Sequence, residues 1–172
     1  MVGLVTRPNA NVRDKNSNLE SLTDGVNNQT QQAFDGLDRL VTITNPDLST
    51  SSYGYDGQDN LDSVTDECSL VTSYVQNGFG EVIQETSPDT GTTVYLRDAA
   101  GNVTRRTDAR SIVTDYSYDA LDRLTAISYP ATPAEDVTYG YDDTTGGNEG
   151  VGRLTSIDDV SGSTAFRSEE RV

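Results

Sequence analysis

A period of 21 residues runs through the chain and constrains its fold more than any other feature. An acidic or amide residue recurs at this interval, and an aliphatic residue follows it five positions later. The recurring positions are Asp14, Asp35, Asp56, Asn77, Asp98, Asp119 and Asp142, with intervals of 21 residues and a last interval of 23. Self-similarity of this kind indicates a repeat architecture, in which one supersecondary unit is copied along the chain.

Tyrosine follows the same period in two columns, three residues and one residue before the acidic position. Eight of the nine tyrosines occupy these columns, and Tyr129 lies outside them. The column members are Tyr53, Tyr55, Tyr74, Tyr95, Tyr116, Tyr118, Tyr139 and Tyr141. We predict that the rings pack neighbouring repeats together, and the alternative is a ladder of exposed rings that stacks on sugars.

Each repeat is predicted to be a β-hairpin. In one copy, residues 112–118 are rich in β-branched and aromatic side chains, residues 119–122 form a turn, and residues 123–129 return. Asp or Asn at the first turn position accepts a backbone N–H two residues on, and Gly, Asn or Asp at the fourth tolerates a left-handed conformation. The aliphatic pair of the returning strand is spaced by three residues, as in Leu124 and Ile127. Either a bulge lies between them, or both faces of that strand are partly covered.

The sequence therefore predicts an all-β chain, with about seven tandem hairpins stacked in one curved antiparallel sheet. We expect a single repeat array over residues 1–172, with an inserted loop at residues 143–150 and an incomplete last repeat at residues 165–172. The loop is polar and glycine-rich, so it should be the most mobile internal segment. The terminal strands should have open edges that can pair with another copy and form a homo-oligomer.

Composition argues against several classes of function. The formal net charge is −16, and the 12 basic residues are scattered, which disfavours nucleic acid and anionic membranes as partners. No apolar run approaches the ~20 residues that a membrane span requires. The chain has no histidine, which is the commonest general base and a common metal ligand. We therefore expect no catalytic, cofactor-binding or metal site, and a protein that is not an enzyme.

Two acidic patterns bear on this expectation. Residues 56–62 (DGQDNLD) superficially match a calcium loop, but Leu61 stands where an EF-hand needs glycine. Asp115 and Asp119 form a carboxylate pair of the kind that glycosidases use, yet no pocket-forming insertion accompanies them. Turn chemistry accounts for the first pattern and for Asp119, and Asp115 is interpreted as a solvated strand residue.

The stretch from Tyr116 to Tyr129 (YSYDALDRLTAISY) resembles the signature of YD, or RHS, repeats, and residues 34–43 and 87–106 look similar. The family includes bacterial RHS polymorphic toxins, shell-forming subunits of insecticidal toxin complexes, and teneurins. The resemblance implies a long β-sheet that spirals into a hollow shell, which in the toxins encloses a C-terminal effector. The chain lacks the DPxG motif of the family's core domain, so no autoproteolytic residues are carried over.

The resemblance also implies a function, which is to form part of a shell wall that encloses or displays a toxin or another effector. The implied partners are the remaining repeats and core domain of the parent protein and an encapsulated effector, with no cofactor. The implied location is secreted or on a bacterial cell surface, although the first ten residues do not form a signal peptide. The alternative function is a carbohydrate- or receptor-binding adhesion module that uses the same sheet.

Overall fold

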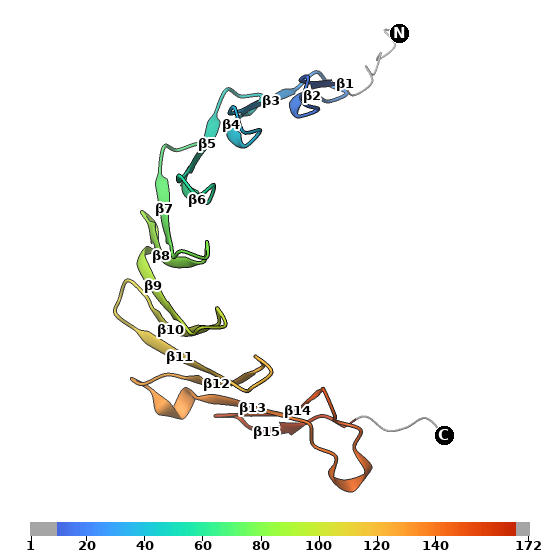
Figure 1. Cartoon of the computed structure of the whole chain (residues 1–172), viewed down its shortest axis with the longest axis vertical. Coiled ribbons are helices and arrows are strands. Elements are labelled where there is room, and N and C mark those ends of the chain that lie inside the picture. Colours follow the sequence, from blue (N-terminus) through green and yellow to red (C-terminus); the bar gives the residue numbers. More distant parts are fainter. Residues whose placement is uncertain (1–9, 168–172) are drawn as a thin grey trace, which may run out of the picture. The chain divides into compact units, whose positions relative to one another are not determined.

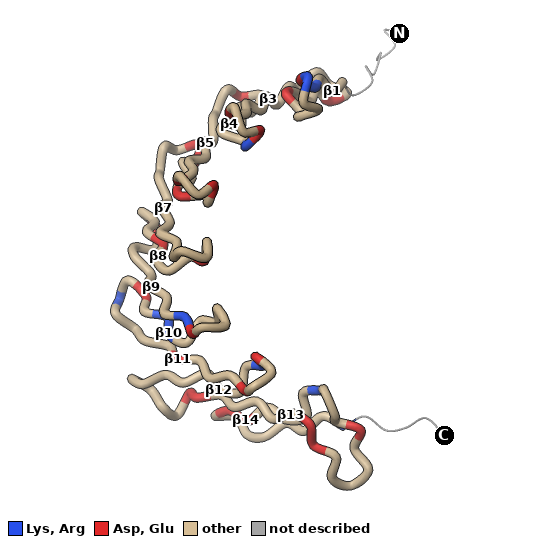
Figure 2. The backbone as a smooth tube through the Cα atoms, in the orientation of Figure 1, with Lys and Arg blue, Asp and Glu red and all other residues tan. Residues whose placement is uncertain are grey.

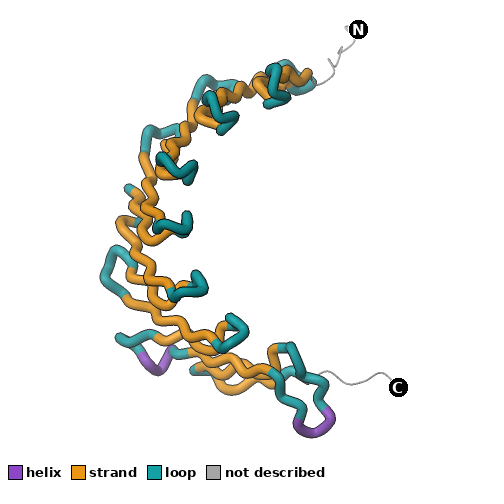
Figure 3. Tube along the Cα trace, in the orientation of Figure 1, coloured by secondary structure: helices purple, strands orange, loops and turns teal. Residues whose placement is uncertain are grey.

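The computed structural model describes residues 10–167, and this range confirms the predicted all-β class. It contains strands joined by short turns and two single-turn 3₁₀ helices (Figures 1 and 3). The chain consists of two compact units, Met1–Thr90 and Gly91–Val172. The assignment of residues 1–172 to one array stays a prediction.

In the first unit, each described strand pairs antiparallel with the next one along the chain. The strands are β1 (Ala10–Arg13), β2 (Leu19–Thr23), β3 (Gln29–Phe34), β4 (Leu40–Thr44), β5 (Thr50–Tyr55), β6 (Leu61–Thr65), β7 (Val71–Gln76) and β8 (Val82–Ser87). One repeat therefore consists of two strands and two turns, and the hairpins lie edge to edge in a single layer.

The second unit continues the same pattern of antiparallel neighbours. Its strands are β9 (Gly91–Arg97), β10 (Val103–Thr107), β11 (Val113–Tyr118), β12 (Leu124–Ser128), β13 (Val137–Tyr141), β14 (Leu154–Asp159) and β15 (Gly162–Ala165). The helix η1 (Pro133–Glu135) lies between β12 and β13, and η2 (Thr145–Gly147) lies in the inserted loop.

A β-bulge at the start of each returning strand resolves the odd spacing of the aliphatic pairs. Tyr118 pairs with Leu124, whereas Ser117 pairs with Ala126, so Thr125 is the extra residue. Shifts of the same kind occur in the other six repeats, as between Phe34 and its neighbour in β3. Because one residue is inserted, the aliphatic residues on either side of the bulge face the same side of the sheet as the tyrosines.

The sheet has no hydrophobic core in the usual sense. Within residues 10–167, no hydrophobic side chain is fully buried, and the buried residues are small or polar. The nine tyrosines are all half-buried. A single layer can cover a side chain only with its lateral neighbours, so contacts between adjacent strands supply the packing that a second layer provides in a sandwich.

The inserted loop folds back on the last strands and does not simply extend from the hairpin tip. Asn148 is buried, and its amide donates to the carbonyl oxygen of Phe166 at 3.3 Å. The Phe166 N–H in turn donates to the carbonyl oxygen of Thr155 at 2.8 Å. The loop is therefore attached to the last strands through Asn148, and its predicted mobility stays a prediction.

Candidate functional site

The acidic residue of each repeat lies at the first position of a five-residue turn. The Asp119 carboxylate accepts the N–H of Leu121 at 2.8 Å and that of Arg123 at 3.0 Å. Asp122, at the fourth position, has a φ of 58°. Hydrogen bonds from the Arg123 N–H and guanidinium hold the pKa of Asp119 below its ordinary value. The same two backbone bonds form at five of the other predicted positions, namely Asp14, Asp35, Asp56, Asn77 and Asp98.

Asp142 is the exception among the predicted turn residues, because the inserted loop follows it. Its carboxylate accepts the N–H of Gly152 at 2.6 Å, ten residues later, and Asp142 itself has a φ of 61°. The backbone N–H of Asp142 still bonds to the carbonyl oxygen of Arg153 at 3.2 Å. The loop thus adds residues to the turn while the closing pair of the hairpin is kept.

A second row of turns, at the opposite ends of the strands, was not recognised in the sequence. Asp24 accepts the N–H groups of Val26 and Asn28, both at 2.9 Å, as Asp119 does in the first row. The row follows the same period and consists of Asp24, Asn45, Asp66, Ser87 and Asp108. The spacing of 21 residues and the Asp or Asn at four of these five positions were the signals that could have found it. Figure 2 shows many of the charged residues in turns at the strand ends.

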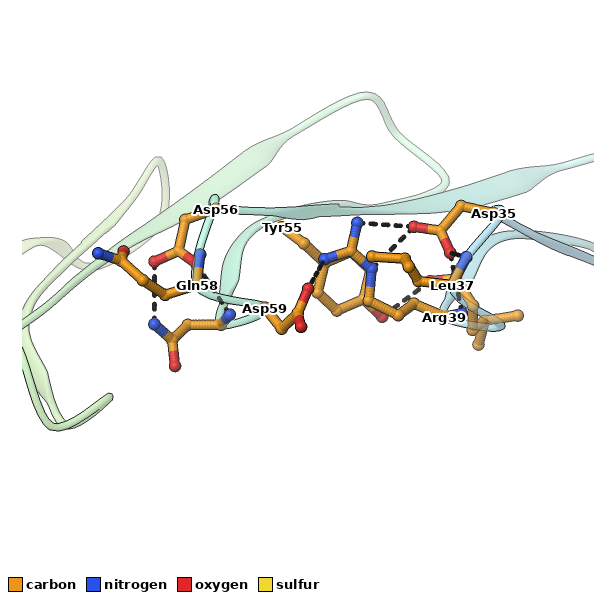
Figure 4. Close-up of polar contacts among 9 residues, drawn as sticks. Asp35, Leu37, Arg39, Tyr55, Asp56, Gln58 and Asp59 are labelled. Atoms are coloured by element: carbon orange, nitrogen blue, oxygen red, sulfur yellow. Dashed lines mark hydrogen bonds and ion pairs between the residues drawn. The ribbon is translucent and has the colours of Figure 1, made fainter.

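Arginines at the fifth turn position link consecutive repeats (Figure 4). The Arg39 guanidinium bonds to Asp35 of its own turn at 2.7 Å and to Asp59 of the next turn at 2.6 Å. It also lies over the ring of Tyr55, 4.5 Å from the ring centroid. This arrangement fixes the next turn and the next tyrosine relative to the first repeat, through charge-assisted and cation–π contacts.

The same link occurs in the second unit, and asparagine forms a similar link through its side-chain amide. Arg123 bonds to Asp119 at 2.7 Å and to Asp142 at 2.6 Å, and lies 4.4 Å from the centroid of the Tyr141 ring. Where asparagine occupies the same position, its amide bonds to the next turn instead, as Asn18 does to Asp38 at 2.8 Å. We use the term turn links for the four bonds that run from the fifth position of one turn to the next turn. They are Arg39–Asp59, Arg123–Asp142, Asn18–Asp38 and Asn102–Asp122.

Tyrosine hydroxyls make a second connection between repeats, on one face of the sheet. The hydroxyl of the tyrosine that precedes the turn donates to the carbonyl oxygen of the aliphatic residue in the previous repeat. These bonds run from Tyr55 to Leu40 at 2.9 Å, from Tyr118 to Val103 at 3.1 Å, and from Tyr141 to Leu124 at 2.9 Å. Burial raises the pKa of the Tyr118 hydroxyl, so it stays a donor across the neutral range.

The opposite face of the sheet carries many small and hydroxyl side chains, with exposed aliphatic residues such as Val75 and Leu96 among them. Residues that alternate with the tyrosines along the outgoing strands are Ala33, Gly54, Val75, Leu96, Ser117 and Gly140. A threonine column runs along the returning strands of the first unit at Thr23, Thr44, Thr65 and Thr86. We call this surface the hydroxyl face. It differs in chemistry from the tyrosine face, which is aromatic and aliphatic.

Other candidate residues have structural partners. The Asp115 carboxylate forms a bidentate pair with Arg105 of the adjacent strand, at 2.6 and 2.9 Å, while Asp119 serves its turn. Cys68 is exposed in a turn of the second row, where its N–H bonds to Asp66 at 2.8 Å. Over residues 10–167, no group of three or more His, Cys, Asp or Glu residues is placed to hold a metal ion. In the same range, no helix is long and apolar enough to cross a membrane.

Together, these features define a tandem β-hairpin repeat protein whose acidic and aromatic residues join one repeat to the next. Residues 34–67 and 97–134 match the family model for the RHS repeat. These two segments therefore match the RHS/YD repeats that the sequence resembles. No curated protein is significantly similar to it.

Solved structures of toxin complexes share the fold. A crystal structure of TcdB2–TccC3 without its hypervariable C-terminal region matches with a TM-score of 0.67 and 19% sequence identity. The complex of TcdB2–TccC3 with Cdc42 matches with a TM-score of 0.66, and the Tc holotoxin pore of Photorhabdus luminescens with 0.64, both at 19% identity. Each match covers 91% of this chain and 9% of the other, so the chain corresponds to a small part of these proteins.

Proposed function

We propose that this chain is a structural segment in the wall of an RHS-type shell that encloses or displays a toxin or another effector. The observation that carries the proposal is the bond from each of three turn-flanking tyrosines to the backbone of the previous repeat. The turn links reinforce it, because they tie one turn to the next along the array. The acidic, arginine and tyrosine side chains in these bonds therefore hold neighbouring repeats together.

The toxin-complex structures support the same proposal, since a fold like that of this chain occurs inside much longer proteins of that class. The remaining repeats and the core domain of the parent protein would then be the direct partners. An effector inside the shell and an extracellular location, secreted or on a cell surface, belong to the proposal. The chain itself would contribute no catalytic residue and no cofactor site.

The test uses the full gene product that contains this chain, imaged by cryo-electron microscopy and treated with protease. We expect a hollow wall that includes these strands, together with a protected segment inside it. A double variant, Tyr55→Ala with Tyr118→Ala, should open the wall and expose that segment. The control, Leu37→Ala with Leu121→Ala, removes exposed turn side chains and should leave protection intact. A gene product without a hollow wall would refute the proposal.

A second candidate is an adhesion module that binds carbohydrate or a receptor through the tyrosine face. The partial exposure of all eight column tyrosines favours it, because half-exposed rings can still stack on a sugar. Binding to a glycan array distinguishes the adhesion module from the wall segment. In such a module Tyr74→Leu would lose glycan binding while Val71→Ala, on the other face of the same strand, would not. A wall segment should bind no glycan in either form.

A further inference from the structure

One stretch of the hydroxyl face departs from the repeat pattern. Strand β3 directs three exposed residues to this face, Gln29, Gln31 and Ala33. At the positions of the two glutamines, the next repeat has Thr50 and Ser52 and the one after it has Val71 and Ser73. The paired amides therefore belong to a single repeat and are not needed to build the hairpin.

A groove lies over this strand. Two adjoining hollows of about 320 and 310 Å³ share Gln29, Gln31 and Thr44 in their walls. The first extends to Val12, Ser21 and Ala33, and the second extends to the turns that hold Asn28 and Asn45. The groove thus follows β3 from the second row of turns to Ala33, near the other end of the strand, and the small side chains of Ala33 and Ser21 leave room for it.

The amides in this groove offer both hydrogen-bonding functions. The Gln31 amino group donates to the Gln29 carbonyl oxygen at 3.0 Å. That bond leaves the Gln29 amino group as a donor and the Gln31 carbonyl oxygen as an acceptor. A carboxamide presents the same N–H and C=O groups as a peptide bond, so this pair can bond to a backbone in both directions.

The dimensions fit an extended chain. Gln29 and Ala33 are four residues apart on a strand, which at about 3.4 Å per residue gives a groove floor of about 14 Å. An extended segment of about five residues has the same length and the same two-residue period as the alternating side chains below it. Val12 at one end, and Pro46 and Leu48 at the other, provide apolar contacts for its side chains.

Charge and composition exclude other ligand classes. Glu20 is the charged residue among the side chains that line the groove, and the chain carries a net charge of −16, so an acidic segment is disfavoured. The lining side chains include no aromatic ring on which a sugar could stack. We propose that this amide-lined groove binds an extended, non-acidic polypeptide segment, an interaction beyond the role of the chain as a wall.

The test uses the full chain and capped hexapeptides of alternating alanine and threonine, with one central lysine or one central glutamate. Side-chain amide signals of Gln29 and Gln31 are followed by NMR during titration. The lysine peptide should shift them saturably, and the glutamate peptide should bind more weakly. The double variant Gln29→Thr with Gln31→Ser installs the side chains of the next repeat, so it should keep its fold. It should bind the lysine peptide at least about fivefold more weakly, because two polar contacts are lost.

The matched control is Thr50→Ala with Ser52→Ala, which changes the same positions one repeat later. Its affinity for the lysine peptide should stay within about twofold of the original. The inference is overturned if millimolar lysine peptide shifts neither glutamine signal, or if the control loses as much affinity as the double variant. It is also overturned if maltohexaose shifts these signals and the peptides do not, since the groove would then bind sugars.

Discussion

Tyr118 donates its hydroxyl proton to the carbonyl oxygen of Val103, fifteen residues earlier and one repeat away, at 3.1 Å. In a single-layer sheet this bond replaces part of the packing that a second layer would provide. The same relationship holds for Tyr55 and Leu40. A tyrosine at this position therefore joins two repeats through its hydroxyl, while its backbone pairs within its own hairpin, as Tyr118 does with Leu124.

The first prediction concerns this hydroxyl. Tyr118→Phe keeps the ring but leaves the Val103 carbonyl without its partner, so it should lower the free energy of unfolding by about 1 kcal/mol. Thermal unfolding and urea titration measure the loss. Tyr129→Phe is the control, because Tyr129 is also half-buried but lies outside the two tyrosine columns. Equal losses in both variants would show that the inter-repeat bond contributes nothing.

The second prediction concerns the turn link of Arg123. Arg123→Ala removes contacts with Asp119, Asp142 and the Tyr141 ring at once, so the melting temperature should fall by a few degrees. Arg110→Ala is the matched control, because the Arg110 side chain is 77% exposed and pairs with Asp108 of its own turn. Surface pairs of that kind contribute little, so the control should unfold almost as the original chain does.

Much of this architecture could be predicted from the sequence, because hairpin formation depends on local patterns. The acidic column located one turn of each repeat, and the spacing of Leu124 and Ile127 left a bulge as one of two explanations, which Thr125 now settles. The turn links could not be predicted. Arg39 and Asp59 are twenty residues apart, and neither residue type identifies its partner. The acceptor of the Tyr118 hydroxyl is a backbone carbonyl group, which every residue has, so the sequence cannot identify it.

The third prediction concerns the stability of the fold at low pH. Hydrogen bonds hold the pKa of Asp24, Asp35, Asp56 and Asp119 below the ordinary value of 3.8. A folded-state pKa that is depressed adds stability above the unfolded-state pKa, and this stability is lost as pH falls through the folded value. The melting temperature should therefore change little between pH 5 and 8, as far as these groups are concerned, and fall below about pH 4.

The variant Asp24→Asn isolates one such group. Asparagine keeps the turn acceptor, as Asn77 shows by accepting the N–H of Phe79 at 2.9 Å. The variant should therefore fold, and its stability should fall less steeply between pH 4 and 2 because one titrating group is gone. An unchanged slope in this range, with NMR titration placing the Asp24 pKa at an ordinary value, would contradict the prediction.

The fourth prediction concerns the anchor of the inserted loop. Asn148→Ala removes the bond to the Phe166 carbonyl and should weaken the attachment of the loop to the segment that follows β15. Limited proteolysis should then cut residues 143–150 faster than in the original chain, because cleavage requires a mobile backbone. Thr144→Ala, in the same loop but exposed, is the control. Unchanged cleavage in the Asn148 variant would mean that the loop is held by other contacts.

The last prediction concerns Leu48, which has a φ of 71° at the fourth position of a turn and is 81% exposed. A left-handed conformation brings Cβ close to the following carbonyl oxygen and costs about 1 kcal/mol or more for an ordinary side chain. Asparagine tolerates it better, and Asn27 holds the same position one repeat earlier with a φ of 70°. Leu48→Asn should therefore stabilise the chain by about 0.5–1 kcal/mol, measured by urea unfolding. The control is Leu37→Asn, which replaces a leucine that is 66% exposed at another turn position and should have little effect on stability. If both variants changed the free energy of unfolding equally, loss of exposed apolar surface would explain the gain, and the backbone strain at Leu48 would not.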